Sequence, residues 1–279
     1  MTHAIEKTSQ RKENIESIEP LISAMRTISL SNWRSSLNRE INQKPFLSEM
    51  ESIYAILNEQ GLPKLQTSTK KKKIIYVLGS NRGLCGNFNK RILKFFNQQN
   101  IGNQNGQEII LVGTKLFKLF SETNIGIQRS IDFPEIQKVQ DFSISICSPL
   151  ANELDQTIIS VVYNKYSGAS KYYPVVREIY PIEKQQTIIS NDKNTNFIID
   201  TNKQHLFSTV EFFLLITYLQ NCLYSSSAAE NSARFVNMEN AGRNVDNLID
   251  ELKIIIQNHR RRLITEETQE LAVSSGLLN

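Results

Sequence analysis

Three glycines within residues 79–87 form the part of the sequence with the clearest potential for chemistry. Gly79, Gly83 and Gly86 are spaced G-x-x-x-G-x-x-G, between a β-branched run and a segment with helical periodicity. Loops in this position often bind phosphate through backbone N–H groups and the helix dipole. The spacing matches neither G-x-G-x-x-G nor a P-loop ending in Gly-Lys-Ser/Thr. Two interpretations remain open: a ligand loop, or a tight turn in which glycine permits unusual backbone angles.

Other residues with chemical potential are few and scattered. Cys85 lies in the same loop, where a helix start can activate a thiol, but no second Cys or His is close to it in sequence. Cys147 and Cys222 form no CxxC pair, and three histidines are too few for a typical zinc site. The sequence contains no HExxH and no Ser/His/Asp pattern. We therefore predict no catalytic residue, no cofactor, no metal and a reducing compartment.

Composition indicates a soluble chain with a buried core. Of its 279 residues 40% are apolar, and the formal net charge of +4 is too mild to suggest a nucleic-acid partner. The first 16 residues have no apolar core of the kind found in signal peptides. The apolar stretch 210–223 contains Glu211 and Gln220 and is short for a membrane span, so we expect a helix buried in protein.

The loop is expected to sit in a small α/β unit with a mainly parallel sheet, because short β-branched runs alternate with helical segments. Polar stretches flank this unit. Residues 61–73, with a lysine run at their end, are expected to be a solvated linker rather than a basic binding patch. The expected strands are 74–78, 109–112, 158–163 and 175–180, with a further edge strand at 196–199, and the expected helices are 88–96 and 115–120.

Both ends of the chain predict long helices. No glycine occurs from Ile5 to Asn58, and Ile15, Ile18, Ile22 and Met25 recur at steps of three and four. The apolar stripe continues at Trp33, Leu37 and Ile41. Two prolines interrupt this helix: Pro20 should kink it or delay its start, and Pro45 should bend it again.

The C-terminal stretch from about residue 204 contains no proline and a single internal glycine, Gly242. Its length as one helix would be roughly 100 Å at 1.5 Å per residue, so it needs a partner helix. Its expected apolar seam is Met238, Ala241, Val245, Leu248, Leu252 and Ile255.

Two helices that flank one compact unit can return past each other and pair antiparallel, which buries both seams. The predicted fold is therefore α/β, with a long antiparallel coiled coil of the terminal helices and a central α/β domain. The expected boundaries are 1–60 for the N-terminal helix, 73–203 for the central domain and 204–279 for the C-terminal helix. This architecture is typical of a lever or a shaft.

Several motifs resemble one family. Residues 79–89, Gly-Ser-Asn-Arg-Gly-Leu-Cys-Gly-Asn-Phe-Asn, are similar to the SDRGLCGGxN signature of the gamma subunit of rotary F-type ATP synthases. Residues 228–238 and 258–267 look like the SExxARMxAM and NxxRQxxITxE patterns, residues 23–25 resemble KITxAM, and residues 112–115 resemble VGxK. The loop positions that match are Gly79, Arg82, Gly83, Leu84, Cys85, Gly86 and Asn89.

The resemblance implies a Rossmann-like foot and a coiled-coil shaft. In the family, the shaft stands inside a ring of three alpha and three beta subunits, and the foot sits with the epsilon subunit on the membrane c-ring. One copy of the chain would couple ion-driven rotation of the c-ring to nucleotide chemistry in the beta subunits, without catalysing a reaction itself. The implied location is peripheral, on the cytoplasmic face of a bacterial plasma membrane or on the matrix or stromal side of an organelle membrane.

Positions near the bearing follow from the same resemblance. Arg260 matches the arginine that meets the catch loops of beta, and Arg261 and Arg262 make the surrounding turn from His259 more basic. Arg234 and Met25 match further positions near the stator. A solvated positive turn, a core position or a solvated helix face are the alternatives for these residues.

The sequence departs from the family at Pro20, at Asn81 in place of aspartate and at Asn87 in place of glycine. Residues 87–92, 204–207 and 243–244 resemble the N-type, sodium-linked branch, and proton coupling stays open. Two other functions remain alternatives to the rotor: a Rossmann-like nucleotide-binding enzyme that uses residues 79–87, and a coiled-coil scaffold that does not rotate.

Overall fold

The computed structural model describes residues 2–59, 72–101, 106–123, 125–151, 153–182 and 202–275. These residues form two compact units. We call Met1–Ser29 with Phe235–Asn279 the helical unit, and Leu30–Arg234 the sheet unit. The helices α2 (Glu19–Glu59) and α6 (Lys203–Ser274) contribute to both. The units therefore divide within the long helices, whereas the boundaries expected from sequence follow the ends of those helices.

The sheet unit contains a five-stranded sheet in the order β3-β2-β1-β4-β5. β1 pairs parallel with β2 and β4, β2 pairs parallel with β3, and only β5 runs antiparallel to its neighbour β4. The three central strands β1, β2 and β4 have apolar, largely β-branched runs that are mostly buried on both faces, as such sheets require. The strands are β1 (Lys72–Leu78), β2 (Gln107–Val112), β3 (Arg129–Ile131), β4 (Thr157–Gly168) and β5 (Lys171–Tyr180).

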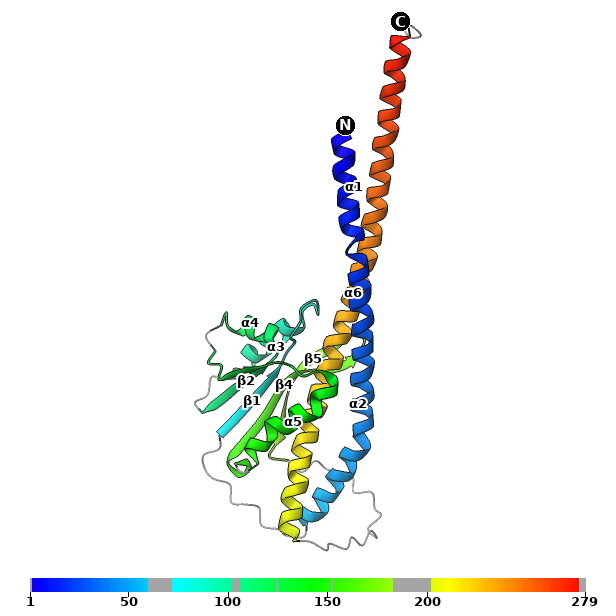
Figure 1. Cartoon of the computed structure of the whole chain (residues 1–279). Coiled ribbons are helices and arrows are strands. Elements are labelled where there is room, and N and C mark those ends of the chain that lie inside the picture. Colours follow the sequence, from blue (N-terminus) through cyan, green and yellow to red (C-terminus); the bar gives the residue numbers. More distant parts are fainter. Residues whose placement is uncertain are drawn as a thin grey trace. The chain divides into compact units, whose positions relative to one another are not determined.

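Helices cover both faces of this sheet (Figure 1). On one face, Ile75 and Val77 pack with the buried side chains of α3 (Phe88–Gln98) and α4 (Thr114–Phe120). On the other face, Ile74 and Tyr76 pack with α2, α6 and α5 (Val139–Cys147). Because side chains alternate across a strand, consecutive residues of β1 enter different cores.

The four expected strands between residues 74 and 180 and both expected short helices are confirmed. β3, α5 and three 3₁₀ turns were not expected. β3 is three residues long and mostly exposed, so it carries no apolar run that would reveal it. Lys72 and Lys73, placed at the end of the linker, already belong to β1. The rest of that linker (60–71) and the expected strand at 196–199 lie outside the described residues.

Within the sheet unit, α2 and α6 run antiparallel. Their contacts show the direction: Ser36 meets Ser227, and Tyr54 stacks on Phe207 with ring centroids 5.2 Å apart. The face of α2 toward this unit follows a strict heptad spacing that includes Trp33 but neither Leu37 nor Ile41, so the expected stripe is partly wrong, and Ile41 is exposed. The residues at the heptad positions are Trp33, Ser36, Glu40, Gln43, Leu47, Met50, Tyr54 and Leu57.

Within the sheet unit, α6 is mostly exposed or half-buried from 203 to 213 and is buried on nearly all sides from 214 to 234. Residues 214–220 and 222–234 are all buried, as expected for a helix covered by protein rather than lipid. By length and composition alone, α6 is the one described helix that could cross a membrane, and 56% of its apolar window is buried inside the protein.

The helical unit begins with α1 (Thr2–Glu16), which is separate from α2. The helix breaks at Ser17 and Ile18, and Pro20 is the second residue of α2, so the expected interruption near Pro20 is confirmed. Proline suits the first turn of a helix, where its missing N–H would have no partner. Because Ile18 lies at the break, its side chain is exposed rather than part of the seam. α2 continues through Pro45.

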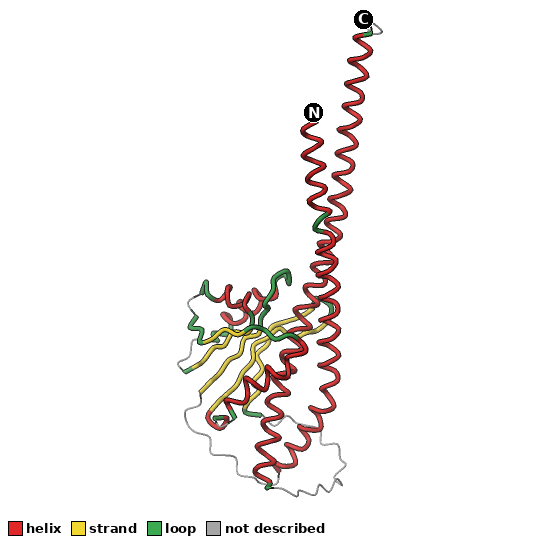
Figure 2. Tube along the Cα trace, in the orientation of Figure 1, coloured by secondary structure: helices red, strands yellow, loops and turns green. Residues whose placement is uncertain are grey.

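The two helical segments of this unit also run antiparallel (Figure 2). Arg26 forms an ion pair with Glu239 at 3.0 Å, and a Cβ built on Gly242 would lie 3.9 Å from Cγ2 of Ile22. The expected seam is partly wrong, because Leu248 and Ile255 are exposed while their neighbours Ile249 and Ile256 are buried. The buried stripe contains Met238, Ile249, Leu252 and Ile256. The predicted fold class, paired terminal helices with a mainly parallel central sheet, is confirmed.

Candidate functional site

The candidate site is the loop of residues 79–87, which we call the β1 loop, together with the part of α6 that it contacts. The loop follows the carboxyl end of β1, where β2 lies on one side and β4 on the other. In open parallel sheets this is the point at which the strand order reverses and at which ligands usually bind. The site is therefore in the right place for a ligand, and its polar groups decide whether it can hold one.

Two glycines bring the β1 loop against the segment that follows β2. A Cβ on Gly79 would lie 2.4 Å from Cβ of Leu116 in α4. Gly113 has φ of +122°, and a Cβ there would lie 2.8 Å from the carbonyl carbon of Gly79. The Gly79 amide donates to the Val112 carbonyl at 2.7 Å. Only glycine permits this close backbone approach at the two positions. Of the two interpretations of the loop, a ligand loop or a tight turn, the contacts favour the tight turn.

Ser80 holds the loop to α3. Its backbone N–H donates to Oδ1 of Asn89 at 3.1 Å, and Nδ2 of Asn89 donates back to Oγ of Ser80 at 2.8 Å. The Ser80 hydroxyl in turn donates to the Arg82 carbonyl at 2.8 Å. Leu84 and Gly86 then adopt positive φ, at 64° and 60°, and Leu84 is exposed. Ser80 thus ties the loop both to α3 and to the loop's own backbone.

Asn81 joins the β1 loop to the loops after β2 and β3. Its Oδ1 accepts from the backbone N–H of Phe133 at 2.9 Å and of Thr114 at 3.3 Å, while its Nδ2 donates to the Phe133 carbonyl at 2.8 Å. An ionised aspartate could accept the first two bonds but could not donate the third. Asparagine therefore fits this chain, although the family signature has aspartate there.

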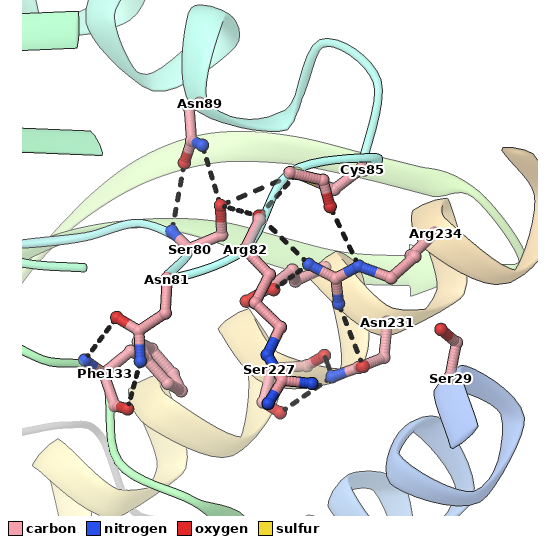
Figure 3. A network of polar contacts seen from close by, with 12 residues as sticks. Ser29, Ser80, Asn81, Arg82, Cys85, Asn89, Phe133, Ser227, Asn231 and Arg234 are labelled. Atoms are coloured by element: carbon pink, nitrogen blue, oxygen red, sulfur yellow. Dashed lines mark hydrogen bonds and ion pairs between the residues drawn. The ribbon is translucent and has the colours of Figure 1, made fainter. Parts of the chain in front are cut away.

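Arg234 of α6 bonds to the β1 loop (Figure 3). It is 7% exposed. Nε donates to the Gly83 carbonyl at 3.1 Å, and Nη2 donates to the Arg82 carbonyl at 3.2 Å. Nη2 also pairs with Oε1 of Glu230, one helical turn earlier, at 2.5 Å. The guanidinium thus bonds to the loop and to its own helix at the same time.

Glu230 is buried beside this guanidinium. Burial raises the pKa of its carboxyl group, and the positive charge of Arg234 opposes that rise. A bonded arginine favours the charged form of a buried carboxyl group. The two residues therefore act as a unit.

A chain of polar contacts continues from Arg234 to α2. Nη1 of Arg234 donates to Oδ1 of Asn231 at 3.3 Å, and Nδ2 of Asn231 donates to the Ser227 carbonyl at 2.9 Å. Oγ of Ser36 in α2 donates to Oγ of Ser227 at 2.9 Å. Figure 3 shows this path from the loop along α6. The small side chains of α6 in this segment allow the β1 loop on one side and α2 on the other to approach closely.

These contacts are the reverse of what a phosphate site needs. A phosphate loop points backbone N–H groups at the anion, whereas the β1 loop turns two carbonyl groups toward a cation. The Ser80 N–H is bonded to Asn89. Within the described residues, no three His, Cys, Asp or Glu side chains come together as a possible metal site. The arrangement can fasten a helix to a sheet.

The three cysteines are all free thiols in buried positions. Burial raises the pKa of Cys147 to about 12 and that of Cys222 to about 11, and it also raises the pKa of Cys85. The thiolate is the reactive species, so a raised pKa keeps these groups inert at neutral pH. We expect no rapid reaction of the native chain with a thiol-specific disulfide dye at pH 8 and reaction of all three thiols after denaturation. A fast-reacting thiol in the native chain would contradict this assignment.

The residues expected to contact a stator differ in their exposure. Arg260, Arg261 and Arg262 are exposed on α6, and Met25 is half-buried on α2. Within the described residues, the three arginines form no ion pair. Arg234 instead has its guanidinium bonded inside the sheet unit, a role that sequence reasoning did not assign to it. The contacts with a stator remain predictions.

Sequence reasoning also missed Glu230, Asn231, Ser227 and Ser36. One signal was present, since a glutamate four residues before an arginine forms a pair on one helix face. The run of small residues from Ser225 to Ala229 was a second, because it permits close approach of a neighbouring segment. Neither signal identifies the loop carbonyls as partners.

Comparison with known proteins gives one consistent result. A family model described as ATP synthase matches residues 4–275. The chain is 27% identical to a protein named ATP synthase gamma chain from Wolbachia sp. subsp. Drosophila simulans, over 96% of this chain and 97% of that protein. It is 23% identical to the ATP synthase gamma chain of Clostridium perfringens, over 94% of each.

A solved structure has the same fold. A chain in the cryo-EM structure of the Euglena gracilis mitochondrial ATP synthase, OSCP/F1/c-ring in rotational state 3, superposes with a TM-score of 0.67. The match covers 99% of this chain and 95% of that one, at 16% sequence identity. At this identity the likeness concerns the fold.

Proposed function

Because this chain belongs to the ATP synthase family, with gamma chains as its named relatives, we propose that it is the rotor shaft of an F-type ATP synthase. It couples rotation of an ion-driven ring to the conformational cycle of catalytic subunits. The observation that carries the proposal is the antiparallel pairing of helices from both chain ends, together with an α/β unit between them in sequence. We retain the boundaries 1–60, 73–203 and 204–279 as the functional division into helix, foot and helix.

The long helix supports a mechanical role. α6 has 72 residues, so its length is roughly 100 Å at 1.5 Å per residue. An isolated helix of that length would bend, and pairing with a second helix stiffens it. The shaft thus transmits torque over a distance greater than the size of a small domain.

The chain itself is proposed to be non-catalytic. At the strand ends, where an enzyme of this topology would bind its ligand, the β1 loop directs the Arg82 and Gly83 carbonyl groups toward Arg234. Nucleotide hydrolysis and synthesis then belong to the alpha and beta subunits. A nucleotide-binding enzyme remains the competing function.

The proposed partners are a ring of three alpha and three beta subunits, an epsilon subunit and a membrane c-ring, with one copy of this chain in each complex. The chain would reach the membrane through these partners, on the cytoplasmic face of a bacterial plasma membrane or the corresponding side of an organelle membrane. The Euglena assembly that contains the similar chain comprises OSCP, F1 and the c-ring, which supports the first and third partners.

Contact with the stator is proposed at Met25 and at the exposed arginines 260–262. A shaft has to turn against its bearing, so exposed charges that engage acidic groups transiently suit it better than buried bonds. For Arg234, we retain stator contact only as a secondary role, since its guanidinium is bonded within the chain.

Reversing the charge of Arg260, Arg261 and Arg262 together to glutamate is expected to reduce ATP-driven ion pumping about tenfold. Each exposed ion pair contributes about 0.2–1 kcal/mol, and about 1.4 kcal/mol changes a rate tenfold. Pumping by the reconstituted complex measures the effect. The control reverses the exposed Lys90, Lys94 and Lys118 of the sheet unit. Equal pumping by the two triple variants would favour a scaffold that does not rotate.

The proposed function is tested by purification of the native complex through a tag on this chain. We expect alpha and beta subunits with a single copy of the chain, ATP hydrolysis by the complex, and none by the chain alone. A solitary monomer would contradict the proposal. Calorimetric binding of ATP or a dinucleotide by the full chain would favour the enzyme.

A further inference from the structure

Within the sheet unit, the strand-end loops contact α6. If the proposed function holds, a rotor would have to transmit torque across this boundary. Most of this boundary is apolar, with Ala229 and Ala233 of α6 in the same core as α3 and α4. Apolar burial is non-directional, so it opposes sliding of the loops along α6 only weakly, and small side chains interlock little with their neighbours. Resistance to sliding therefore depends on the polar bonds.

Arg234 supplies the strongest of these bonds. Its guanidinium donates to two successive loop carbonyls, those of Arg82 and Gly83, at 3.2 and 3.1 Å. A planar fork bonded at two points fixes orientation as well as distance. Elsewhere between the sheet and α6, Ser225 accepts a bond from the backbone N–H of Tyr166 at 3.2 Å. Arg177 of β5 donates to Oδ1 of Asn221 at 3.5 Å, and its guanidinium lies over the Tyr218 ring at 4.6 Å from the centroid.

Both ends of this fork are fixed. On the loop side, Asn81 connects the β1 loop to the segments after β2 and β3, so three strand ends are bonded together. On the helix side, the Glu230 carboxylate holds the guanidinium, and Asn231 and Ser227 extend the contact to Ser36 of α2. One guanidinium thus connects the edge of the sheet with both long helices.

We propose that Arg234 is a torque-transmitting clasp: a positioning residue whose forked bonds to the β1 loop prevent the sheet from slipping around α6 under load. Its charge pair with Glu230 keeps the side chain in place, and the two loop carbonyls give the link its direction. The clasp is distinct from the apolar core, which would hold the unit together without it.

The Arg234→Lys substitution distinguishes the effect of the forked bonds on slipping from the effect of the buried charge pair on stability. Lysine keeps a positive charge beside Glu230, so the buried carboxylate remains paired, but a single ammonium cannot reproduce the fork to two carbonyls. Arg243→Lys makes the same chemical change at an exposed position of α6 and is the matched control. Glu230→Gln is a second variant, which leaves the arginine in place and removes the charge that holds it.

The measurement is made on the assembled complex with its stator immobilised and stalled. A bead is attached to the sheet unit through Lys94→Cys on α3, an exposed position, and the native thiols are buried. The variance of the bead angle reports the torsional stiffness between the sheet unit and the stator. ATP hydrolysis by the same preparations shows that each complex is assembled.

In Arg234→Lys, we expect the angular variance to rise about twofold, because about half of the directional bonds of the guanidinium are lost. Glu230→Gln should give a smaller rise, and Arg243→Lys should match the wild type. Wild-type variance in both Arg234→Lys and Glu230→Gln would overturn the clasp. If Arg234→Lys fails to assemble, Glu230→Gln alone decides by the same criterion.

The wild-type complex separates the clasp from the rotor function on which it rests. A bead on this chain that never rotates during hydrolysis would refute the rotor itself. A rotating wild-type bead together with unchanged stiffness in the variants would refute only the clasp.

Discussion

Replacing Arg234 by alanine is expected to lower the free energy of unfolding of the sheet unit by about 3–5 kcal/mol. The change leaves the buried Glu230 carboxyl group without a counter-charge, removes the Nε donor of the Gly83 carbonyl and leaves the Arg82 carbonyl bonded only within the β1 loop. Burial already raises the pKa of Glu230, and the bonded arginine favours its charged form. The loss of one partner therefore has a larger effect than the net contribution of the pair.

Urea unfolding followed by tryptophan fluorescence measures this effect. Trp33 is the only tryptophan, and its ring centroid lies 6.1 Å from that of Tyr166 inside the sheet unit. The exposed Arg243→Ala control should change stability by no more than about 0.5 kcal/mol. A double variant, Arg234→Met with Glu230→Gln, should recover part of the loss because no charge is left buried. A loss for Arg234→Ala no greater than that of the control would contradict the buried pair.

Gly113→Ala is expected to destabilise the sheet unit by about 2–6 kcal/mol, through backbone strain and through a clash. The residue has φ of +122°, which L side chains rarely adopt, and its Cβ would lie 2.8 Å from the carbonyl carbon of Gly79 and 2.9 Å from the carbonyl oxygen of Ser80. These are backbone atoms of the β1 loop and cannot rotate away. The loop and α4 would have to separate.

Two other glycines allow the two causes to be separated by the same urea titration. Gly106 has φ of +88° with open space around it, so Gly106→Ala reports strain alone. Gly126 has neither a positive φ nor a neighbour within 4 Å, and Gly126→Ala should be neutral or stabilising by about 0.4–1 kcal/mol. If Gly113→Ala were no more destabilising than Gly106→Ala, the close approach to Gly79 would be unimportant.

The sequence predicted the elements well where a single periodicity was available. The β-branched runs of β1 and β2 and the amphipathic α3 have clear patterns. The predicted seam of α6 was wrong at Ile255. Ile254, Ile255 and Ile256 are consecutive, so a heptad spacing fits more than one of them. The partner helix selects Ile256, and sequence periodicity of one helix does not contain that information.

The polar parts of the structure were harder to predict. α2 keeps heptad spacing through Ser36, Glu40 and Gln43, positions that an apolar pattern excludes. Gln43 pairs with Gln220 of α6, and Ser36 with Ser227. Such contacts depend on which residues face each other after folding. The sequence of either helix alone therefore predicts a solvated face there.

The sequence pointed to the β1 loop as the candidate site, but it did not predict that the loop carbonyls bond to Arg234. Glycine spacing identified the β1 loop and left a ligand loop and a tight turn as alternatives. The choice depends on whether N–H or carbonyl groups point outward, which backbone angles decide and composition does not. Arg234 was expected near a stator because it matches a position of the family there, and a core position was an alternative. Its partners lie about 150 residues earlier in the chain.

The most direct test of the rotor assignment is a reversible cross-link between shaft and stator. Arg262→Cys introduces a thiol at an exposed position of α6, while the native thiols are buried. Oxidation to a disulfide with a cysteine placed in a beta subunit is expected to stop ATP hydrolysis by the complex, and reduction should restore it. Hydrolysis at the full rate with the cross-link closed would contradict the account, because a shaft that is fixed to its stator cannot turn.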